Sequence, residues 1–260
     1  MSNGKVAIVT GAAGGIGEGI VRRLGQNGVR VVGTGRSGEK LAALKDRLGS
    51  SMEFSFIASD ITATDAPKAI VEHALATFGR LDILVNNAGS FNFGPVDQTT
   101  DDMLDEVFGI SLRAPFRLCR EALPHLGQGS SVLFIGSTWG IYGTPGGGAY
   151  STVKAGQIGL MQTMAAEYGP RGVRSNYVAP TVVRTEMTSA FWEADFFRRT
   201  NHELTPMNRE CTIADVANMV AFLSSDEAGF INGQTIAVDG GISSTRYVAP
   251  EAVMAQRQQA

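Results

Sequence analysis

The chain has 260 residues and a formal net charge of −3, so it can bury one large α/β core and lacks the basic excess that favours nucleic-acid binding. Its cysteines, Cys119 and Cys211, lie far apart, and its three histidines lack ligand spacing, which argues against disulfides and a metal site. There is no signal-peptide pattern and no run of about 18 apolar residues. We therefore expect a cytoplasmic protein without a membrane or nucleic-acid partner.

Short apolar runs alternate with longer segments of helical spacing along the chain. The predicted strands span residues 5–9, 29–33, 53–58, 81–85, 131–135, 173–178 and 234–238. Segments predicted to be helical include residues 19–28, 39–49, 66–79, 101–126, 149–168 and 213–225. Continuous apolar strands are buried on both faces, and alternation with helices makes them parallel. The predicted fold is α/β, a Rossmann-type doubly wound sheet of seven mostly parallel strands with helices on both faces.

The chain contains no linker, internal repeat or low-complexity segment, so residues 1–241 are predicted to form one Rossmann-type domain. Residues 181–212 show no strand pattern and contain the aromatic stretch FWEADFF. A segment of this length in a compact domain is often functional, and we call it the lid because we expect it to cover the substrate. Residues 242–260 are predicted to be a polar C-terminal tail.

A glycine-rich stretch, TGAAGGIGEGI, follows the first predicted strand. Gly11, Gly15 and Gly17, with Ile16 between the last two, allow a tight turn and a close approach to a pyrophosphate. The following helix N-terminus offers free amides to that phosphate. A plain tight turn is the alternative, but the position between a strand and a helix favours a dinucleotide site.

The end of the second predicted strand, GTGRSGEK, bears on which dinucleotide is bound. Gly35 stands where a carboxylate would hold ribose hydroxyls, and Arg36 and Ser37 follow. A guanidinium suits a 2′-phosphate, so NADP(H) is favoured and NAD(H) remains an alternative. Arg36 as a solvated loop residue is also open, and Gly14 lacks the basic side chain that many NADP(H)-binding relatives carry there.

The stretch AYSTVK places Tyr150 four residues before Lys154. On a helix these side chains share one face, where a fixed positive charge is expected to lower the pKa of the phenol and fit it for acid/base catalysis. An exposed tyrosine and lysine on a solvated helix face is the alternative from this spacing alone.

Further motifs occur in a fixed order along nearly the whole chain. Ser137 precedes Tyr150 by thirteen residues, and other motifs are the pair Asp60 and Ile61, and the segments 86–89 (NNAG), 176–180 (NYVAP) and 238–241 (VDGG). Together they resemble the short-chain dehydrogenase/reductase family in its compact form, particularly its 3-oxoacyl-ACP reductase-like members.

The resemblance implies a role for each motif. Tyr150 would be the acid/base, Lys154 its electrostatic partner and a ligand of the nicotinamide ribose, and Ser137 a donor to the substrate carbonyl. The cofactor would be bound by Gly11, Gly15, Ile16, Gly17, Arg36, Ser37, Asp60, Ile61, Asn87, Ala88, Gly89, Tyr150, Lys154, Pro180, Val183 and Thr185. Each motif taken alone has a structural alternative. Ser137 could only cap a helix, NNAG could only form a turn, and Val183 and Thr185 could be a hydrophobic spacer and a surface threonine.

Two positions depart from the pattern of that family. Ser111 stands where the family usually has an asparagine that bends a helix and relays protons from the lysine. We expect Ser111 either to support a relay or only to bond within its helix. Thr181 stands where glycine is common, and its branched side chain is expected to restrict the backbone and crowd the cofactor.

An apolar substrate site is predicted from aromatic residues and a methionine near these motifs, namely Trp139, Tyr142, Met187, Phe191 and Trp192, with Phe196 and Phe197 as further members. Their packing in the core is the alternative. The sequence thus predicts interconversion of a ketone and a secondary alcohol, with 3-oxoacyl and cyclic ketones as candidate substrates. A non-catalytic dinucleotide sensor is the alternative function, and a dehydratase or epimerase fits this length less well. The resemblance also implies a homotetramer.

Overall fold

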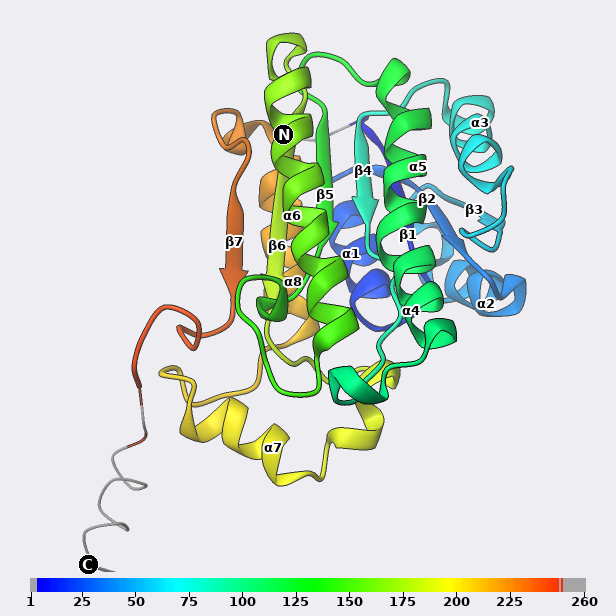
Figure 1. The fold of residues 1–260 in the computed structure, drawn as a ribbon. Helices are drawn as coiled ribbons and strands as arrows, with labels where there is room; N and C mark the ends of the chain where they lie inside the picture. The colour runs from blue at the N-terminus through cyan, green and yellow to red at the C-terminus, as the bar shows by residue number, and fades with distance from the viewer. Residues whose placement is uncertain (1–3, 248, 250–260) are drawn as a thin grey trace, which may run out of the picture.

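A parallel sheet forms the centre of the computed structural model, which describes residues 4–247 and Ala249 (Figure 1). The seven strands lie in the order β3-β2-β1-β4-β5-β6-β7, and every described ladder is parallel. They are β1 (Val6–Thr10), β2 (Arg30–Gly35), β3 (Phe54–Ala58), β4 (Ile83–Asn86), β5 (Ser131–Ile135), β6 (Arg174–Pro180) and β7 (Thr235–Val238). The predicted fold class is confirmed, because each strand ends within about two residues of its predicted bounds.

Two sets of helices cover the two faces of the sheet. One apolar core lies under α1 (Gly15–Gln26), α2 (Gly38–Leu48) and α8 (Ile213–Ser224). The other lies under α3 (Ala66–Phe78), α5 (Ala114–Ala122) and α6 (Gly148–Tyr168). Strands β1, β4 and β5 are buried along their whole length. Their continuous apolar runs therefore reflect burial on both faces of the sheet, as predicted from the sequence.

The segment predicted to be helical over residues 101–126 is helical from Asp101 to His125, but it contains a π-helical turn that the sequence did not predict. Helix α4 (Asp101–Phe108) gives way to a π-helical turn over Gly109–Arg113 before α5 begins. The Ala114 N–H bonds to the Gly109 carbonyl, five residues back. Residues on both sides keep helical dihedral angles, so the helix continues through the turn. The hydrophobic spacing along the sequence is therefore almost that of a regular helix and could not reveal the turn.

The strand order reverses direction between β1 and β4, and connections leave these two strands toward opposite faces. In an open parallel sheet this arrangement creates a crevice at the carboxyl ends of the strands. The lid lies beyond the same edge, where α7 (Asp195–Arg198) is labelled in Figure 1. Its two ends are joined by a bridge between Val183 and Cys211 and by a bidentate ion pair from Arg184 to Glu210, at 2.7 and 2.9 Å. The lid is therefore anchored at its base.

The glycine-rich turn between β1 and α1 has backbone dihedral angles that glycine adopts readily and other residues do not. Gly11 has a φ of 64° and Gly15 a φ of 42°, in the left-handed region that side chains disfavour. A Cβ at Gly17 would collide with the Gly11 carbonyl oxygen, whereas one at Gly14 would meet nothing within 4 Å. Gly17 is therefore needed for close helix packing, and Gly14 is not.

Most of the predicted tail, residues 242–260, lies outside the described residues. Ala249 is described, and its N–H bonds to the Glu203 carbonyl of the lid at 3.0 Å. The division into a domain of residues 1–241 and a tail stays a prediction. Among the described helices, none has the length and apolar character needed to cross a bilayer.

We predict that Gly17→Ala destabilises the protein by about 1–3 kcal/mol, because the added methyl group must displace the Gly11 peptide. Gly14→Ala is the matched control in the same turn, and it should change the free energy of unfolding by less than about 0.5 kcal/mol. Urea unfolding of both variants measures the difference. Equal stability of the two variants would contradict the packing argument.

Candidate active site

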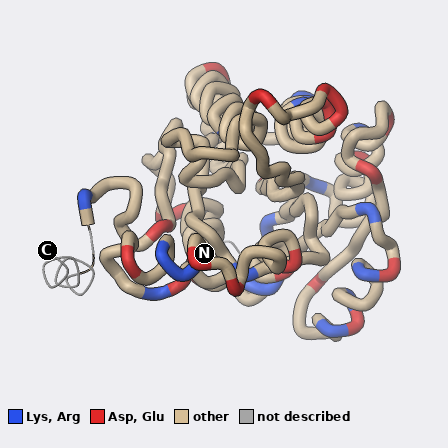
Figure 2. Tube along the Cα trace, turned by 60° about the horizontal axis from the view of Figure 1, so that its bottom comes forward, with Lys and Arg blue, Asp and Glu red and all other residues tan. Residues whose placement is uncertain are grey.

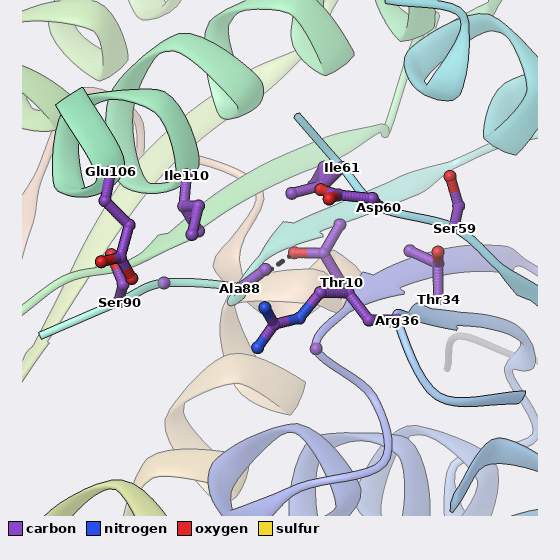
Figure 3. A pocket seen from close by; sticks show the side chains of 13 residues that line it. Thr10, Thr34, Arg36, Ser59, Asp60, Ile61, Ala88, Ser90, Glu106 and Ile110 are labelled. Atoms are coloured by element: carbon purple, nitrogen blue, oxygen red, sulfur yellow. Dashed lines mark hydrogen bonds between the residues drawn. The ribbon is translucent and has the colours of Figure 1, made fainter. Parts of the chain in front are cut away.

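A cavity at the carboxyl ends of β1, β2, β3 and β4 gathers most of the residues predicted to bind the adenosine half of a dinucleotide (Figure 3). It is lined by Thr10, Gly11, Thr34, Gly35, Arg36, Ser59, Asp60, Ile61, Ala88, Gly89, Ser90, Glu106 and Ile110. Four motifs that are distant in the sequence therefore meet here. The cavity lies at the crevice that the strand order creates.

A hydrogen-bond network centred on Thr10 joins the ends of β1 and β4. The Thr10 hydroxyl accepts hydrogen bonds from the Asn87 and Ala88 N–H groups, at 2.9 and 2.8 Å, the second of which is dashed in Figure 3. The Asn87 carboxamide donates to the Thr10 carbonyl at 2.8 Å. Asn87 thus holds the glycine turn in place, a role that its position in NNAG alone did not reveal.

Arg36 extends its guanidinium into the cavity (Figure 3). Asp60 accepts hydrogen bonds from the Thr62 N–H at 2.9 Å and the Thr62 hydroxyl at 2.7 Å. These bonds, with a smaller effect of the Arg36 charge, lower the pKa of Asp60. Ser37 caps α2 by accepting a hydrogen bond from the Lys40 N–H at 3.1 Å, so its oxygen already has a structural role.

The three predicted catalytic residues meet beside the end of β5. Ser137 lies two residues beyond that strand, and Tyr150 and Lys154 lie on successive turns of α6. The Ser137 side chain is hydrogen-bonded to Tyr150. Lys154 Nζ donates to the Ile135 carbonyl at 2.9 Å and lies 5.5 Å from the centroid of the Tyr150 ring. The sequence spacing therefore brings these groups into one small volume.

Burial dominates the electrostatics of this trio. It raises the pKa of Tyr150 to about 12, while the hydrogen bond with Ser137 lowers it. It lowers the pKa of Lys154 to about 8, so the amine remains mostly protonated at pH 7. The expectation of a lowered phenol pKa does not hold for the protein groups alone, since desolvation of the phenolate outweighs the attraction of the lysine. Tyr150 is therefore a stable proton donor at neutral pH.

Tyr177 is a residue of this site that sequence reasoning missed. It is fully buried on β6, and its hydroxyl accepts a hydrogen bond from the Ser137 N–H at 2.9 Å and donates to the Ser137 carbonyl at 3.3 Å. A Cβ at Gly136 would collide with the Tyr177 ring, and one at Gly140 would lie 2.6 Å from its hydroxyl oxygen. Tyr177 thus fixes the backbone of Ser137 from below. The paired glycines in GSTWG were the available sequence signal.

A second cavity, of about 270 Å³, opens over Ser137 and Tyr150. Phe91 and Phe93, which follow NNAG, contribute to its wall and were also missed by sequence reasoning. The Phe91 ring meets the Tyr150 ring edge to face, with centroids 5.0 Å apart. Trp139, Phe191, Phe196 and Met187 complete the apolar wall. Among the described residues, none that lines this cavity is charged.

Three aromatic residues of the predicted substrate site lie elsewhere. Tyr142 and Trp192 are absent from the lining of the cavity. The Tyr142 hydroxyl bonds to Thr138 at 3.3 Å, and the Trp192 indole N–H to Thr188 at 3.1 Å. Phe197 is buried, with the Arg184 guanidinium 5.0 Å from its ring centroid. These three side chains stabilise the loop and the lid instead of contacting the cavity.

Four of the residues predicted to bind the cofactor line the same cavity as Tyr150. They are Ile16, Pro180, Val183 and Thr185. A Cβ at Gly15 would lie 2.7 Å from the Thr185 methyl group, so the lid begins against the glycine turn. Thr181 also lines the cavity and is not among the residues with positive φ. Its branched side chain is thus accommodated without a left-handed backbone.

Ser111, the predicted relay residue, lies at the centre of the π-helical turn and is fully buried. Its hydroxyl accepts a hydrogen bond from the Ser90 N–H at 3.2 Å. A Cβ at Gly89 would lie 3.5 Å from the Ser111 hydroxyl and 3.7 Å from Lys154 Nζ. The helix bend is therefore present without an asparagine, and Ser111 stays close to Lys154.

Comparisons with known proteins agree with this geometry. The family model described as Enoyl-(Acyl carrier protein) reductase matches residues 11–243. A 3-oxoacyl-[acyl-carrier-protein] reductase from Thermotoga maritima is 34% identical over 242 residues, covering 92% of this chain and 98% of the relative. The chain belongs to the short-chain dehydrogenase/reductase family.

Solved structures of two further proteins extend this result to the cofactor. A short-chain dehydrogenase from Burkholderia cenocepacia in complex with NADP is 33% identical, with a TM-score of 0.87, covering 93% of this chain and 99% of that one. A 3-ketoacyl-(acyl-carrier-protein) reductase from Brucella melitensis, complexed with NADH, is 29% identical, with a TM-score of 0.86 and coverage of 94% and 100%.

The protein is thus an NAD(P)-dependent oxidoreductase that interconverts a ketone and an alcohol. The glycine turn, with its close approach at Gly17 and its open position at Gly14, fits a nicotinamide dinucleotide. No observation supports the non-catalytic sensor that the sequence left as an alternative. Among the described residues there is no cluster of histidine, cysteine and carboxylate side chains that could hold a metal ion.

We predict that Tyr177→Phe lowers kcat about tenfold, because the Ser137 N–H loses its buried acceptor and the serine loses its fixed position. The KM for the cofactor should change less than threefold, since Tyr177 does not line the adenosine cavity. Tyr168→Phe, near the far end of α6, is the control and should keep full activity. Steady-state kinetics with unchanged circular dichroism spectra would make the comparison. An unchanged kcat in Tyr177→Phe would contradict this role.

We predict that kcat/KM for the reduced cofactor is highest near pH 7, is about half of that value at pH 8 and falls roughly tenfold per pH unit above about pH 9. This quantity reports the groups of the free enzyme, in which the pKa of Lys154 is lowered to about 8. Loss of its proton above that pH removes the positive charge from the site, whereas Tyr150, with its raised pKa of about 12, keeps its proton. Initial rates in buffers of constant ionic strength provide the test. A profile that stays flat to pH 10 would contradict the assignment.

Proposed function

We propose that the protein is an NADPH-dependent reductase of uncharged, apolar ketones, acting through Tyr150, Lys154 and Ser137. The observation that carries this proposal is the aromatic cavity built directly over the Tyr150 hydroxyl, with Phe91 5.0 Å and Trp139 6.0 Å from its ring. An apolar wall favours a substrate that buries hydrocarbon beside its carbonyl group. A small polar ketone would leave this wall without a partner.

The chemistry divides between the cofactor and the protein. When bound, the nicotinamide cofactor supplies the hydride that reduces the carbonyl carbon. Ser137 and Tyr150 bond the carbonyl oxygen, and Tyr150 gives that oxygen its proton as the electron pair of the carbonyl moves onto it. The phenolate left on Tyr150 is stabilised by the Lys154 charge and recovers a proton from solvent. Lys154 would also hold the ribose of the nicotinamide when the cofactor is bound.

The preference for NADP(H) rests on Arg36. Its guanidinium lies in the adenosine cavity, and the preceding residue, Gly35, has no carboxylate to repel a phosphate. A guanidinium binds a phosphate through two parallel hydrogen bonds, which favours the phosphorylated cofactor. Glu106 lines the same cavity near Ser90 (Figure 3).

A free ketone is preferred over an acyl-carrier-protein thioester in this proposal. Acyl carrier proteins are acidic, so a carrier-dependent enzyme benefits from a basic surface around its entrance. Figure 2, turned so that the lid edge comes forward, shows basic and acidic residues interspersed. The chain is similar to a 3-oxoacyl-[acyl-carrier-protein] reductase and matches a family model described as an enoyl reductase. The test therefore includes a 3-oxoacyl thioester and an enoyl thioester.

We also propose that the protein is a homotetramer that works in the cytoplasm. The exposed Phe116 on α5, with 52% of its surface accessible, supports an interface on the α5 and α6 side. The described cysteines, Cys119 and Cys211, are both free and buried, as suits a reducing compartment.

The test is a substrate panel followed by absorbance of the reduced nicotinamide at neutral pH. We expect the highest kcat/KM with aryl or alicyclic ketones and NADPH, at least tenfold above a 3-oxoacyl thioester and an enoyl thioester. A thioester that exceeds every free ketone would overturn the substrate class. Absence of turnover with all carbonyl substrates and both cofactors would overturn the proposal.

We predict that Arg36→Ala lowers affinity for NADPH by about 10- to 100-fold, because a charge-assisted phosphate contact contributes roughly 1.5–3 kcal/mol. Affinity for NADH, which lacks the phosphate, should change less than threefold. Arg23→Ala, on α1 where the guanidinium bonds to Asn218 of α8 and lies outside the adenosine cavity, is the matched control and should affect neither cofactor. Fluorescence titration of both cofactors measures the change. Equal losses for NADPH and NADH would contradict the role of Arg36.

A further inference from the structure

Gln157 is a buried polar residue of α6 that neither the sequence motifs nor the mechanism uses. It lies three residues after Lys154, on the same side of the helix, and only 1% of its surface is exposed. A buried carboxamide costs free energy unless it is hydrogen-bonded. Its nitrogen, Nε2, donates to the carbonyl oxygen of Ser111 in the π-helical turn.

The π-helical turn explains why Ser111 needs this partner. Five-residue spacing of the backbone hydrogen bonds, seen from Ala114 N–H to the Gly109 carbonyl, disturbs the regular ladder, and the residue four positions after Ser111 is Pro115, which has no N–H to offer the Ser111 carbonyl. Ser111 is fully buried, so an unpaired carbonyl there would be costly. The side-chain amide of Gln157 therefore stabilises the turn in its bent form.

The bond also fixes Ser111 with respect to Lys154. The carbonyl of Ser111 is held by α6, and its hydroxyl is held by the Ser90 N–H at 3.2 Å. Lys154 and Gln157 are neighbours on one helix, so their positions relative to Ser111 are coupled. A Cβ added at Gly89 would lie 3.5 Å from the Ser111 hydroxyl and 3.7 Å from Lys154 Nζ, so both groups border the same position.

We propose that Gln157 is a positioning residue that supplies, from α6, the carboxamide that position 111 lacks. Ser111 keeps a hydroxyl near Lys154, and Gln157 holds the bent backbone that carries it. The family usually has one asparagine at position 111 for this purpose. Here the role is shared between Ser111 in the π-helical turn and Gln157 on α6. This inference rests on the proposed function, since it concerns the return of a proton to Tyr150 through Lys154.

The primary test compares Gln157→Leu with the double variant Ser111→Asn, Gln157→Leu. Leucine keeps the size of the side chain and removes the amide, so we expect kcat for ketone reduction to fall 10- to 100-fold. The KM for NADPH should change less than threefold. In the double variant the asparagine restores a carboxamide to the same turn, and kcat should recover to within threefold of the parent. Circular dichroism and thermal unfolding of each variant establish that it is folded.

Met161→Leu is the control for a general packing change, because Met161 is fully buried one turn further along α6 and contacts only the apolar core. It should keep kcat within twofold. A kcat of Gln157→Leu within twofold of the parent would overturn the inference. So would failure of the double variant to recover kcat while its thermal stability equals that of Gln157→Leu.

Tyr150→Phe separates failure of the inference from failure of the proposed function. If Tyr150→Phe abolishes turnover and Gln157→Leu does not lower kcat, the proposed mechanism stands and the role of Gln157 is wrong. If Tyr150→Phe leaves turnover intact, the proposed function itself fails. The pH profile adds a readout beyond folding, because a disturbed Lys154 should move the alkaline fall of kcat/KM in Gln157→Leu but not in Met161→Leu.

Discussion

The site depends on one buried cation, Lys154, held by the carbonyl of Ile135 at the end of β5. Only 4% of Lys154 is exposed, so its charge acts in a medium of low effective dielectric constant and its pKa falls to about 8. The hydrogen bond of 2.9 Å to Ile135 compensates part of the desolvation. Every other catalytic element is arranged around this charge, from Tyr150 one turn before it to Ser111 across the helix interface.

Several side chains act on the reaction only by holding others. Tyr177 binds both backbone groups of Ser137, and Thr10 binds the two N–H groups that begin the NNAG loop. Gln157 holds the carbonyl of Ser111. Each of these supporting groups is buried, where a hydrogen bond restricts geometry more strongly than it does in water. The precision of the site therefore comes from the second layer of residues as much as from the reacting ones.

The substrate side of the site follows a different physical logic. It is built from rings on three segments: Phe91 after β4, Trp139 after β5, and Phe191 in the lid. Phe91 and Trp139 contact the Tyr150 ring edge to face, and desolvation of the phenol by its surroundings raises its pKa to about 12. The same rings select an apolar substrate in the proposed function. Substrate choice and proton donation are thus linked through burial of one hydroxyl group.

Local sequence determined a large part of this protein. Apolar runs gave the strands because a parallel sheet buried on both faces tolerates little else, and the four-residue spacing from Tyr150 to Lys154 placed them together because a helix has a fixed period. Gly11 and Gly15 marked the turn because their positive φ values are costly for other residues. Ordered motifs then sufficed to recognise the family.

Only the tertiary structure decided which side chains meet across elements. Tyr177 lies 40 residues from Ser137 and Gln157 lies 46 residues from Ser111, and the sequence does not mark these pairs, because a buried hydrogen bond between strand and loop or between two helices has no sequence period. The π-helical turn escaped for a related reason, since one extra residue barely alters the hydrophobic pattern of 101–126. The direction of the Tyr150 pKa shift was likewise set by packing, because burial depends on rings that arrive from β4, β5 and the lid.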